Sequence, residues 1–366
     1  MAAPSPLKRG WGRADRKRVV RRPIRSLLLL CLGLAALCAP SAGAGTYAPP
    51  KGTVIHGGTG GYAAADIREF ARLSGREPGV YQYFFTPEWT SPGGRSLNWQ
   101  RGLLRESAAA GVRTMFHLST ARDGHGRATV STGALARGAG DGYLIDLNRM
   151  IAESGQVVYV RFLAEMNNFN NPYSAVSGSG RRRGREHSTQ AYRQAFRRAA
   201  LILRGGPVAA INARLGRLRM PVLSTSAPEL PQPQVALMWV PLTAGLPYVR
   251  GNSPGDYWPG SRYVDWVGTD FYANSPNFRM LNRLYGDRRW RDKPFVFGEY
   301  AVWGREDPGF MRDLFAWIGS HRRVGMAVYN QAAAKKPIFR LRSYPRTATE
   351  LGRLLGAPRY VLRLAP

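Results

Sequence analysis

Eight short apolar runs alternate along this chain with amphipathic stretches of helical periodicity, and this alternation constrains the fold more than any other feature. Such runs are typical of buried parallel strands, and the stretches between them predict helices that cover the sheet. Eight units over about 310 residues favour one closed (β/α)8 TIM barrel over a doubly wound sheet. The strand-like runs are Thr53–His56, Val80–Phe85, Val112–Leu118, Gln156–Ala164, Val235–Pro241, Val264–Phe271, Pro294–Gly298 and Gly325–Tyr329.

The amphipathic stretches fill most gaps between these runs, and the sequence contains no internal repeat and no linker. We therefore expect a single domain over residues 45–366, with loops at Gly178–Arg185 and at the proline-rich Pro228–Pro233. The apolar content of 44% is sufficient for a substantial core. The predicted helices are Ala63–Leu73, Trp99–Ala110, Asp141–Glu153, Thr189–Leu203, Ser275–Trp290, Pro308–Ser320 and Thr347–Leu355.

The first 44 residues differ in kind from the rest. A basic stretch from Lys8 to Arg25 precedes an apolar run from Leu27 to Cys38, and an Ala-Gly-Ala sequence ends at Ala44. The apolar run is shorter than a membrane span, so the pattern predicts a secretory signal that is removed before Gly45, and hence an extracellular protein. The alternative is an uncleaved N-terminal membrane anchor.

Both cysteines, Cys31 and Cys38, lie inside this apolar run. Residues 45–366 therefore lack cysteine, which excludes disulfides, thiol catalysis and thiolate metal ligands from the predicted domain. Leu37 stands where a lipoprotein signal needs a small residue, which disfavours lipid anchoring. The five histidines show no metal-ligand spacing, and we expect neither a metal nor a cofactor.

The chain carries a net charge of +30, of which the first 44 residues supply +8 from nine basic and one acidic residue. About +22 thus remains for the predicted domain, mostly as dispersed arginine. The densest cluster, Arg181-Arg182-Arg183-Gly-Arg185, lies in a Gly/Ser-rich segment without aromatic residues. We interpret the charge as compositional bias and expect no nucleic-acid partner; binding to nucleic acid or to an acidic envelope polymer is the alternative.

A glycine-rich segment follows the first predicted strand. Its residues, Gly57-Gly-Thr-Gly-Gly-Tyr-Ala63, satisfy the Gly-x-Gly-x-x-Ala pattern of dinucleotide-binding folds. No acidic residue closes a second strand about 20 residues later, because Val80–Phe85 is followed by Thr-Pro-Glu88 in a loop. We interpret the glycines as a turn at the mouth of the barrel.

Two glutamates stand at the ends of predicted strands: Glu165 closes Gln156–Ala164, and Glu299 closes Pro294–Gly298. Carboxylates at the rim of a sheet are half-removed from water, where their pKa values can be shifted and their directions fixed. A pair of this kind is what cleavage of a glycosidic bond requires. The alternative is that each is a surface charge.

Four segments resemble glycoside hydrolase family 26 (GH26), the β-mannanase family of retaining (β/α)8 enzymes. Arg161-Phe-Leu-Ala-Glu-Met-Asn167 is similar to its fourth-strand motif Arg-Pro-x-His-Glu-Met-Asn. Tyr257–Tyr272 resembles its sixth-strand motif, Pro-Gly-x-x-Tyr-Val-Asp-Trp-Val-Gly-x-Asp-x-Tyr. Ala236–Pro241 and Lys293–Glu299 resemble its fifth and seventh strands.

The resemblance implies that Glu165 is the general acid/base and Glu299 the nucleophile of a retaining hydrolase, with Tyr272 bonded to the nucleophile. Strand alternation would place Arg161, Leu163 and Glu165 on one face of their strand. It would likewise place Gly268, Asp270 and Tyr272 on one face of theirs, so that Arg161 and Asp270 point into the barrel near the two glutamates. Asp265 is expected to be a structural partner at the start of its strand. The candidate substrate contacts are His117, Arg161, Asn167, Trp239, Trp258, Asp270, Tyr272 and Trp303.

The chain also departs from the family pattern. Ala164 stands where the family has a histidine, and Tyr300-Ala301 replaces small residues after the nucleophile. We expect a monomer acting on a β-linked polysaccharide or oligosaccharide, with β-mannan as the first choice. The alternatives are another β-glucan, a xylan or an envelope glycan as substrate, or a catalytically silent glycan-binding barrel.

Overall fold

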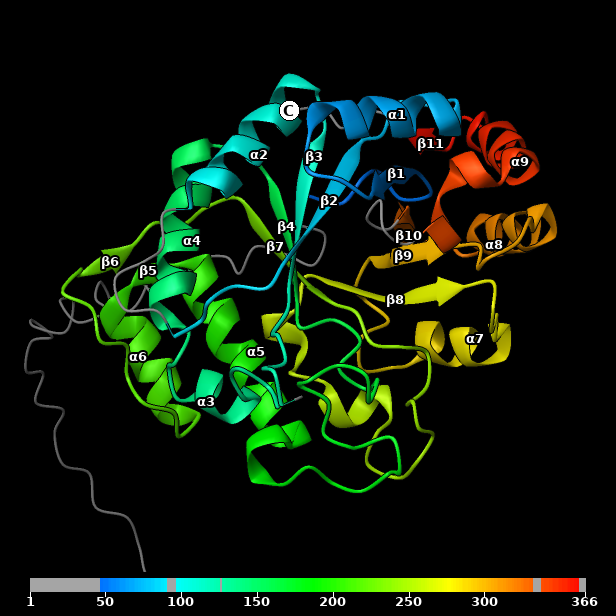
Figure 1. The fold of residues 1–366 in the computed structure, drawn as a ribbon. Helices are drawn as coiled ribbons and strands as arrows, with labels where there is room; N and C mark the ends of the chain where they lie inside the picture. Colours follow the sequence, from blue (N-terminus) through cyan, green and yellow to red (C-terminus); the bar gives the residue numbers. More distant parts are fainter. Residues whose placement is uncertain (1–46, 91–96, 126, 332–336, 362–366) are drawn as a thin grey trace, which may run out of the picture. The chain divides into compact units, whose positions relative to one another are not determined.

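In the computed structural model, the described residues are 47–90, 97–125, 127–331 and 337–361, and eight of their strands form a closed parallel barrel (Figure 1). Each barrel strand pairs with the next, and β10 pairs with β1 to close the ring. The predicted (β/α)8 fold is confirmed. The barrel strands are β1 (Val54–Thr59), β2 (Val80–Phe85), β3 (Arg113–Leu118), β4 (Val158–Phe162), β7 (Val235–Trp239), β8 (Trp266–Tyr272), β9 (Phe295–Ala301) and β10 (Val324–Asn330).

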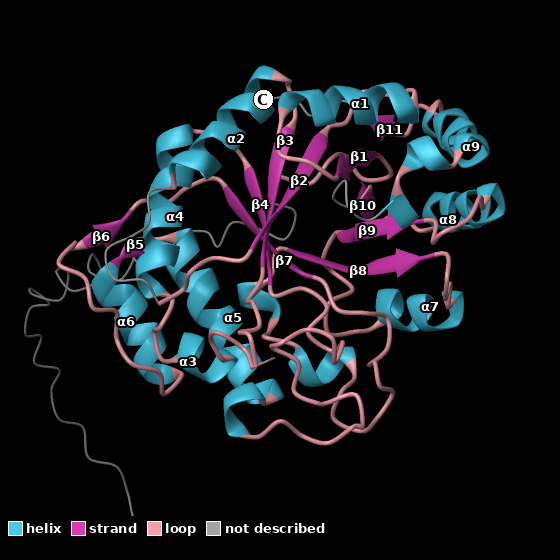
Figure 2. Cartoon of the chain, viewed as in Figure 1, coloured by secondary structure: helices cyan, strands magenta, loops and turns pink. Residues whose placement is uncertain are grey.

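Helices lie outside this ring in the positions that the amphipathic stretches predict (Figure 2). These are α1 (Ala64–Ser74), α2 (Asn98–Ala109), α4 (Asp141–Ser154), α5 (Thr189–Arg204), α7 (Phe278–Gly286), α8 (Pro308–Ser320) and α9 (Pro345–Leu355). The sequence did not predict α3 (Thr132–Ala136), α6 (Val208–Arg217), the two-residue pair β5 (Gly206–Pro207) and β6 (Glu229–Leu230), or β11 (Tyr360–Val361). Short 3-10 turns are η1 (Arg185–His187), η2 (Pro254–Tyr257), η3 (Ser261–Tyr263), η4 (Pro337–Phe339) and η5 (Leu341–Ser343).

Local capping fixes where several helices begin. The Ser188 hydroxyl accepts a hydrogen bond from the amide of Ala191 at 3.1 Å and starts α5. The Asp307 carboxylate accepts one from the amide of Phe310 at 2.9 Å, and Pro308 follows it at the first position of α8. Both residues satisfy amides that the helix itself leaves without a partner.

The glycines of the first strand serve close packing. β1 continues to Thr59, three residues beyond the predicted His56, so Gly57 and Gly58 lie inside the strand. A Cβ at Gly57 would come within 2.2 Å of the Val80 carbonyl, and one at Gly58 within 2.6 Å of the Phe70 ring. Gly57 and Gly58 lie in a barrel strand, and the sheet of that barrel is closed. The alternative of a dinucleotide-binding fold, which needs an open sheet, is therefore wrong.

Apolar side chains fill much of the barrel interior. The largest is Trp266, at the amino end of β8, which meets Tyr159 edge to face at a centroid distance of 5.9 Å. Polar side chains such as Arg161, Asp270 and Glu299 lie further towards the carboxyl ends of the strands. The interior cluster is Ile55, Val80, Met115, Tyr159, Ala164, Ala236, Met238, Val240, Trp266, Val296, Met326 and Val328.

The predicted signal segment and both cysteines lie outside the described residues. Within the described part, no helix is long and apolar enough to cross a bilayer.

Asp265 joins β7 to β8 as a structural partner. Its carboxylate accepts a hydrogen bond from the amide of Leu237 at 2.8 Å and from Arg204 Nη2 at 2.9 Å. We expect Asp265→Ala to lower the free energy of unfolding by roughly 1–3 kcal/mol, because it leaves a buried amide without a partner. Urea denaturation measures the loss. Asp265→Asn keeps one acceptor oxygen and should lose less; an equal loss would contradict this account.

Candidate active site

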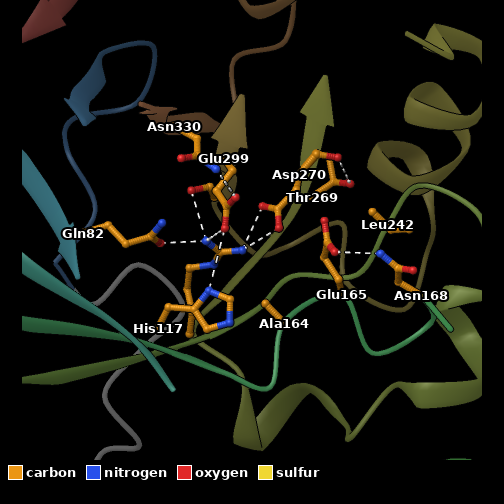
Figure 3. A network of polar contacts seen from close by, with 12 residues as sticks. Gln82, His117, Ala164, Glu165, Asn168, Leu242, Thr269, Asp270, Glu299 and Asn330 are labelled. Atoms are coloured by element: carbon orange, nitrogen blue, oxygen red, sulfur yellow. Dashed lines mark hydrogen bonds and ion pairs between the residues drawn. The ribbon is translucent and has the colours of Figure 1, made fainter. Parts of the chain in front are cut away.

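The carboxyl ends of β4, β8, β9 and β10 bring the two predicted glutamates to one polar site (Figure 3). Its centre is Arg161, a fully buried arginine on β4. Arg161 Nη1 donates to Glu299 Oε1 at 2.8 Å, and Nη2 donates to both oxygens of Asp270 at 2.9 and 2.6 Å. One cation therefore fixes two carboxylates on two different strands.

Arg161 is itself held by β2 and β9. Nη1 also donates to Gln82 Oε1 at 2.7 Å and to the carbonyl of Gly298 at 3.2 Å. A Cβ at Gly298 would lie 2.9 Å from the guanidinium carbon, so this position leaves room for the arginine only as glycine. The sequence did not predict Gln82, because an isolated glutamine in an apolar strand carries no motif.

Glu299 is surrounded by donors. Tyr272 Oη donates to its Oε2 at 2.5 Å, and Asn330 Nδ2 donates to the same oxygen at 2.7 Å. The predicted bond from Tyr272 is present. Burial acts to raise the pKa of Glu299, but the charge of Arg161 and the contacts with His117 and Tyr272 lower the pKa to about 2. This carboxylate is ionised at neutral pH.

An irregularity in β9 turns Glu299 into the barrel. Phe297 is paired with Thr269, whereas Glu299 is paired with the next residue, Asp270, so Gly298 is an extra residue on β9. Because side chains alternate along a strand, this bulge reverses the direction of every later side chain. Without it, Glu299 would share the outward face of Phe297, which packs in the outer core.

Glu165 is positioned by a second irregularity. β4 ends at Phe162, and Leu163 and Glu165 both have left-handed backbone conformations, with φ of 49° and 52°. Leu163 consequently packs in the outer core, and the predicted alternation of Arg161, Leu163 and Glu165 on one face is wrong. Non-glycine residues rarely adopt this conformation, and at functional sites the cost is offset by surrounding structure.

Neighbouring contacts hold Glu165 in place. Its amide donates to the carbonyl of Val240 at 2.7 Å, and Asn168 Nδ2 donates to its Oε2 at 2.9 Å. Burial raises the pKa of Glu165, and the charge of Glu299 adds to the rise, against the Asn168 bond and the charge of Arg161. The two glutamates therefore differ in the direction of their pKa shifts, as an acid and a nucleophile require.

Asp270 is the third carboxylate of the site and is buried. Burial raises the pKa of Asp270 well above its usual range; Arg161 opposes the rise, while the charges of Glu299 and Glu165 add to it. Three carboxylates thus share a single arginine. Because Glu299 is negatively charged, the electrostatic balance favours a proton on one of the other two carboxyl groups, Glu165 or Asp270.

His117 lies beside Glu299, with Nδ1 3.7 Å from Glu299 Oε1. Burial and the charge of Arg161 lower the pKa of His117, and the neighbouring Glu299 opposes part of this fall. Neither ring nitrogen has a hydrogen-bond partner among the described residues. The contact of His117 with a sugar hydroxyl stays a prediction.

The predicted aromatic contacts divide into two groups. Trp303 follows β9, is 41% exposed, and meets Tyr272 and Phe339 at centroid distances of 5.4 and 4.9 Å. It therefore lies against Tyr272, the residue that donates to Glu299. Trp239 has no exposed surface and packs with the half-buried Trp258 outside the barrel, at 5.0 Å. The structure does not bring these two to the site.

The side-chain amide that bonds Glu165 is that of Asn168, whereas Asn167, the predicted substrate contact, lies elsewhere. Asn167 is fully buried, with Oδ1 and Nδ2 bonded to the backbone of Leu242 at 2.8 and 3.1 Å. It holds the loop after β7 against the loop after β4. Ala164, which replaces the family histidine, belongs to the apolar interior cluster and carries no polar side-chain atom.

No protein-family model and no curated protein sequence matches this chain. Solved structures do match it. The barrel has a GH26-like fold. A GH26 β-mannanase from Bacteroides ovatus superposes with a TM-score of 0.56 at 14% identity, covering 84% of this chain and 90% of the other. GH26A from Muricauda sp. gives 0.53 at 13%, covering 85% and 92%, and the YdhT protein from Bacillus subtilis gives 0.55 at 16%, covering 87% of both.

The raised pKa of Glu165 makes a prediction about stability. A carboxyl whose folded pKa is raised loses folding stability as pH rises from its unfolded pKa through its folded pKa. We therefore expect Glu165→Gln to raise Tm by a few degrees at pH 7, and this gain to shrink towards pH 4, where the carboxyl is protonated in both states. Calorimetry at the two pH values measures the difference. The exposed Glu77→Gln is the control, and a lower Tm for Glu165→Gln at pH 7 would refute the idea.

Proposed function

We propose that this chain is a secreted, retaining glycoside hydrolase that cleaves a β-linked polysaccharide, with β-mannan as the first substrate to test. The observation that carries the proposal is a pair of carboxyl groups at one barrel mouth in different settings: Arg161, Tyr272 and Asn330 donate to Glu299, whereas Asn168 donates to Glu165. The pKa shifts agree with this geometry, since the pKa of Glu299 is lowered and that of Glu165 is raised. The GH26-like fold supports the same reaction class, since similar barrels include an endo-β-1,4-mannanase from Cellulomonas fimi.

In the first step, a carboxylate oxygen of Glu299 bonds to the anomeric carbon while the bond from this carbon to the leaving oxygen breaks. Glu165 gives its proton to that oxygen, and the leaving sugar departs as an alcohol. Arg161, Tyr272 and Asn330 keep Glu299 ionised and fixed in direction before the attack. They reduce the reorganisation that the attack requires.

In the second step, Glu165 removes a proton from water, the water oxygen bonds to the anomeric carbon, and the ester to Glu299 breaks. The change of role has a physical cause. Part of the rise in the pKa of Glu165 comes from the charge of Glu299, and ester formation removes that charge. Glu165 thereby becomes a better base when a base is needed.

Trp303 is the candidate platform for the sugar on the nucleophile side. An indole face suits the apolar face of a pyranose, and this indole is partly exposed against Tyr272, the tyrosine bonded to Glu299.

The reaction predicts a matched set of variants. We expect wild-type residues 45–366 to release reducing ends from β-mannan, and both Glu165→Gln and Glu299→Gln to lower the rate at least about 100-fold. Glu77→Gln should have no effect. NMR of the first product should show the β-anomer. No release from mannan, β-glucan or xylan by folded protein, with glycan binding retained, would support the silent binding barrel instead.

Secretion has its own test. The full chain, expressed in a bacterial secretion host with its own N-terminus, should appear in the medium with Gly45 as its first residue. N-terminal sequencing decides this, and a full-length product retained in the membrane fraction would support the anchor.

A further inference from the structure

Three exposed apolar side chains gather on the loop after β7: Leu246 is 44% exposed, Tyr248 74% and Val249 37%. An exposed apolar cluster on a small area usually marks a contact surface. We infer that this loop is a sugar-binding subsite on the leaving-group side of Glu165, and that it selects a glycan bearing carboxylates. The inference rests on the proposed function and names the chemistry of its substrate.

The loop is fixed in place by the acid/base segment. The amide of Leu246 donates to the carbonyl of Asn167 at 2.8 Å, and the amide of Phe169 donates to the carbonyl of Leu246 at 2.8 Å. Between these two bonds lies Asn168, the residue whose amide holds Glu165. The loop backbone is thus hydrogen-bonded to the residues on both sides of Asn168, which itself holds Glu165.

Buried polar contacts make the rest of the loop rigid. Asn252, with no exposed surface, donates to the carbonyls of Asn167 and Pro247 at 3.0 and 2.9 Å, and accepts from Tyr257 Oη at 2.7 Å. An exposed tyrosine on a fixed backbone loses little entropy when it stacks on a ligand. Tyr248 therefore suits a sugar face.

The loop lies on the leaving-group side. Asn168 and Leu242 lie beyond Glu165 as seen from Glu299, whereas Trp303 lies on the nucleophile's own strand end (Figure 3). Since the acid/base protonates the leaving oxygen, sugars beyond Glu165 belong to the leaving group. The loop that carries Tyr248 is thus attached beside Glu165, and Trp303 is attached beside Glu299 through Tyr272.

Arginines flank Tyr248 without compensating acids. Val249 packs near Gly180, where an added Cβ would lie 3.2 Å from Val249 Cγ1, and the next residues on the two loops are Arg250 and Arg181. Arg181, Arg182 and Arg250 are exposed, and none has an ion pair among the described residues. The guanidinium fork matches a carboxylate in geometry and charge.

The acids of these two loops are already engaged. Besides Glu165, residues 165–188 contain only Glu186, which pairs with Arg137 at 2.8 Å. Residues 240–263 contain only Asp256, whose carboxylate accepts from Ser253 at 2.8 and 2.6 Å. The surface around Tyr248 is therefore positive, and a carboxylated chain would complement it.

Two ligands with the same sugar backbone distinguish the effect of charge from that of shape. They are the β-1,4-mannose hexamer and the β-1,4-mannuronate hexamer, which carries a carboxylate on every ring. We expect the inactive Glu165→Gln variant to bind the mannuronate hexamer at least about tenfold more tightly by calorimetry at low salt, with the preference falling as salt rises. Adding Arg181→Gln, Arg182→Gln and Arg250→Gln should abolish the preference. Adding Tyr248→Ala should weaken both ligands severalfold.

A matched control removes the same charge elsewhere. Arg105, Arg214 and Arg217 are exposed on α2 and α6, and their triple Gln variant should keep the preference. Equal affinity for both hexamers, a preference that survives the loop triple variant, or no binding of either would overturn the inference. If the wild type hydrolyses mannan but binding shows no preference for the mannuronate hexamer, the proposed function stands and this inference fails. If binding depends on the loop arginines but no glycan is hydrolysed, the proposed function alone fails.

Discussion

The site depends on a single buried cation. Arg161 lies among Asp270, Glu299 and Gln82 with no exposed surface, and its charge is what lets a buried Glu299 stay ionised. Removing one partner of such a group leaves an uncompensated charge in a region of low polarity, at a cost of roughly 3–5 kcal/mol. One arginine faces three carboxylates, and the pKa values of Glu165 and Asp270 are both raised, mainly by burial, with the charge of Glu299 adding to the rise. This imbalance favours retention of a proton on one of these two groups.

Both catalytic candidates owe their directions to departures from regular strand geometry. A bulge at Gly298 turns Glu299 inward, and left-handed backbone at Leu163 and Glu165 brings the acid to the mouth. A regular strand would offer its side chains only on two opposed faces. A local irregularity allows a side chain to point in an intermediate direction, and the packing of the surrounding barrel offsets the conformational cost.

The fold followed from the sequence because its signals are local and repeated. The apolar runs and amphipathic stretches place all eight barrel strands, and Val80–Phe85 and Pro308–Ser320 match at both ends. The short α3 and the pair β5–β6 carry too few residues to show a period. The strand-end position of each glutamate also followed from the sequence, but the bulge that orients Glu299 did not, since a glycine before a glutamate has no distinctive pattern.

Supporting side chains were harder to predict. Asn167 and Asn168 are indistinguishable in sequence, yet one holds a loop and the other holds the acid, because the segment leaves the strand at Phe162. Trp239 lies on the outward face that alternation assigns to Val235 and Leu237, so its place in the core could have been predicted from the strand period. Asn330 donates to Glu299 from the end of β10, and no sequence motif singles it out.

The geometry around Gly298 constrains how this site can evolve. The position needs an extra residue in the strand, and a side chain there would meet both the guanidinium of Arg161 and the carboxylate of Asp270, each at 2.9 Å. A side chain at 298 therefore requires Arg161 or Asp270 to move, and loss of the arginine would remove one of the two obstacles. Among relatives of this chain, we expect glycine at 298 and arginine at 161 to be kept or lost together.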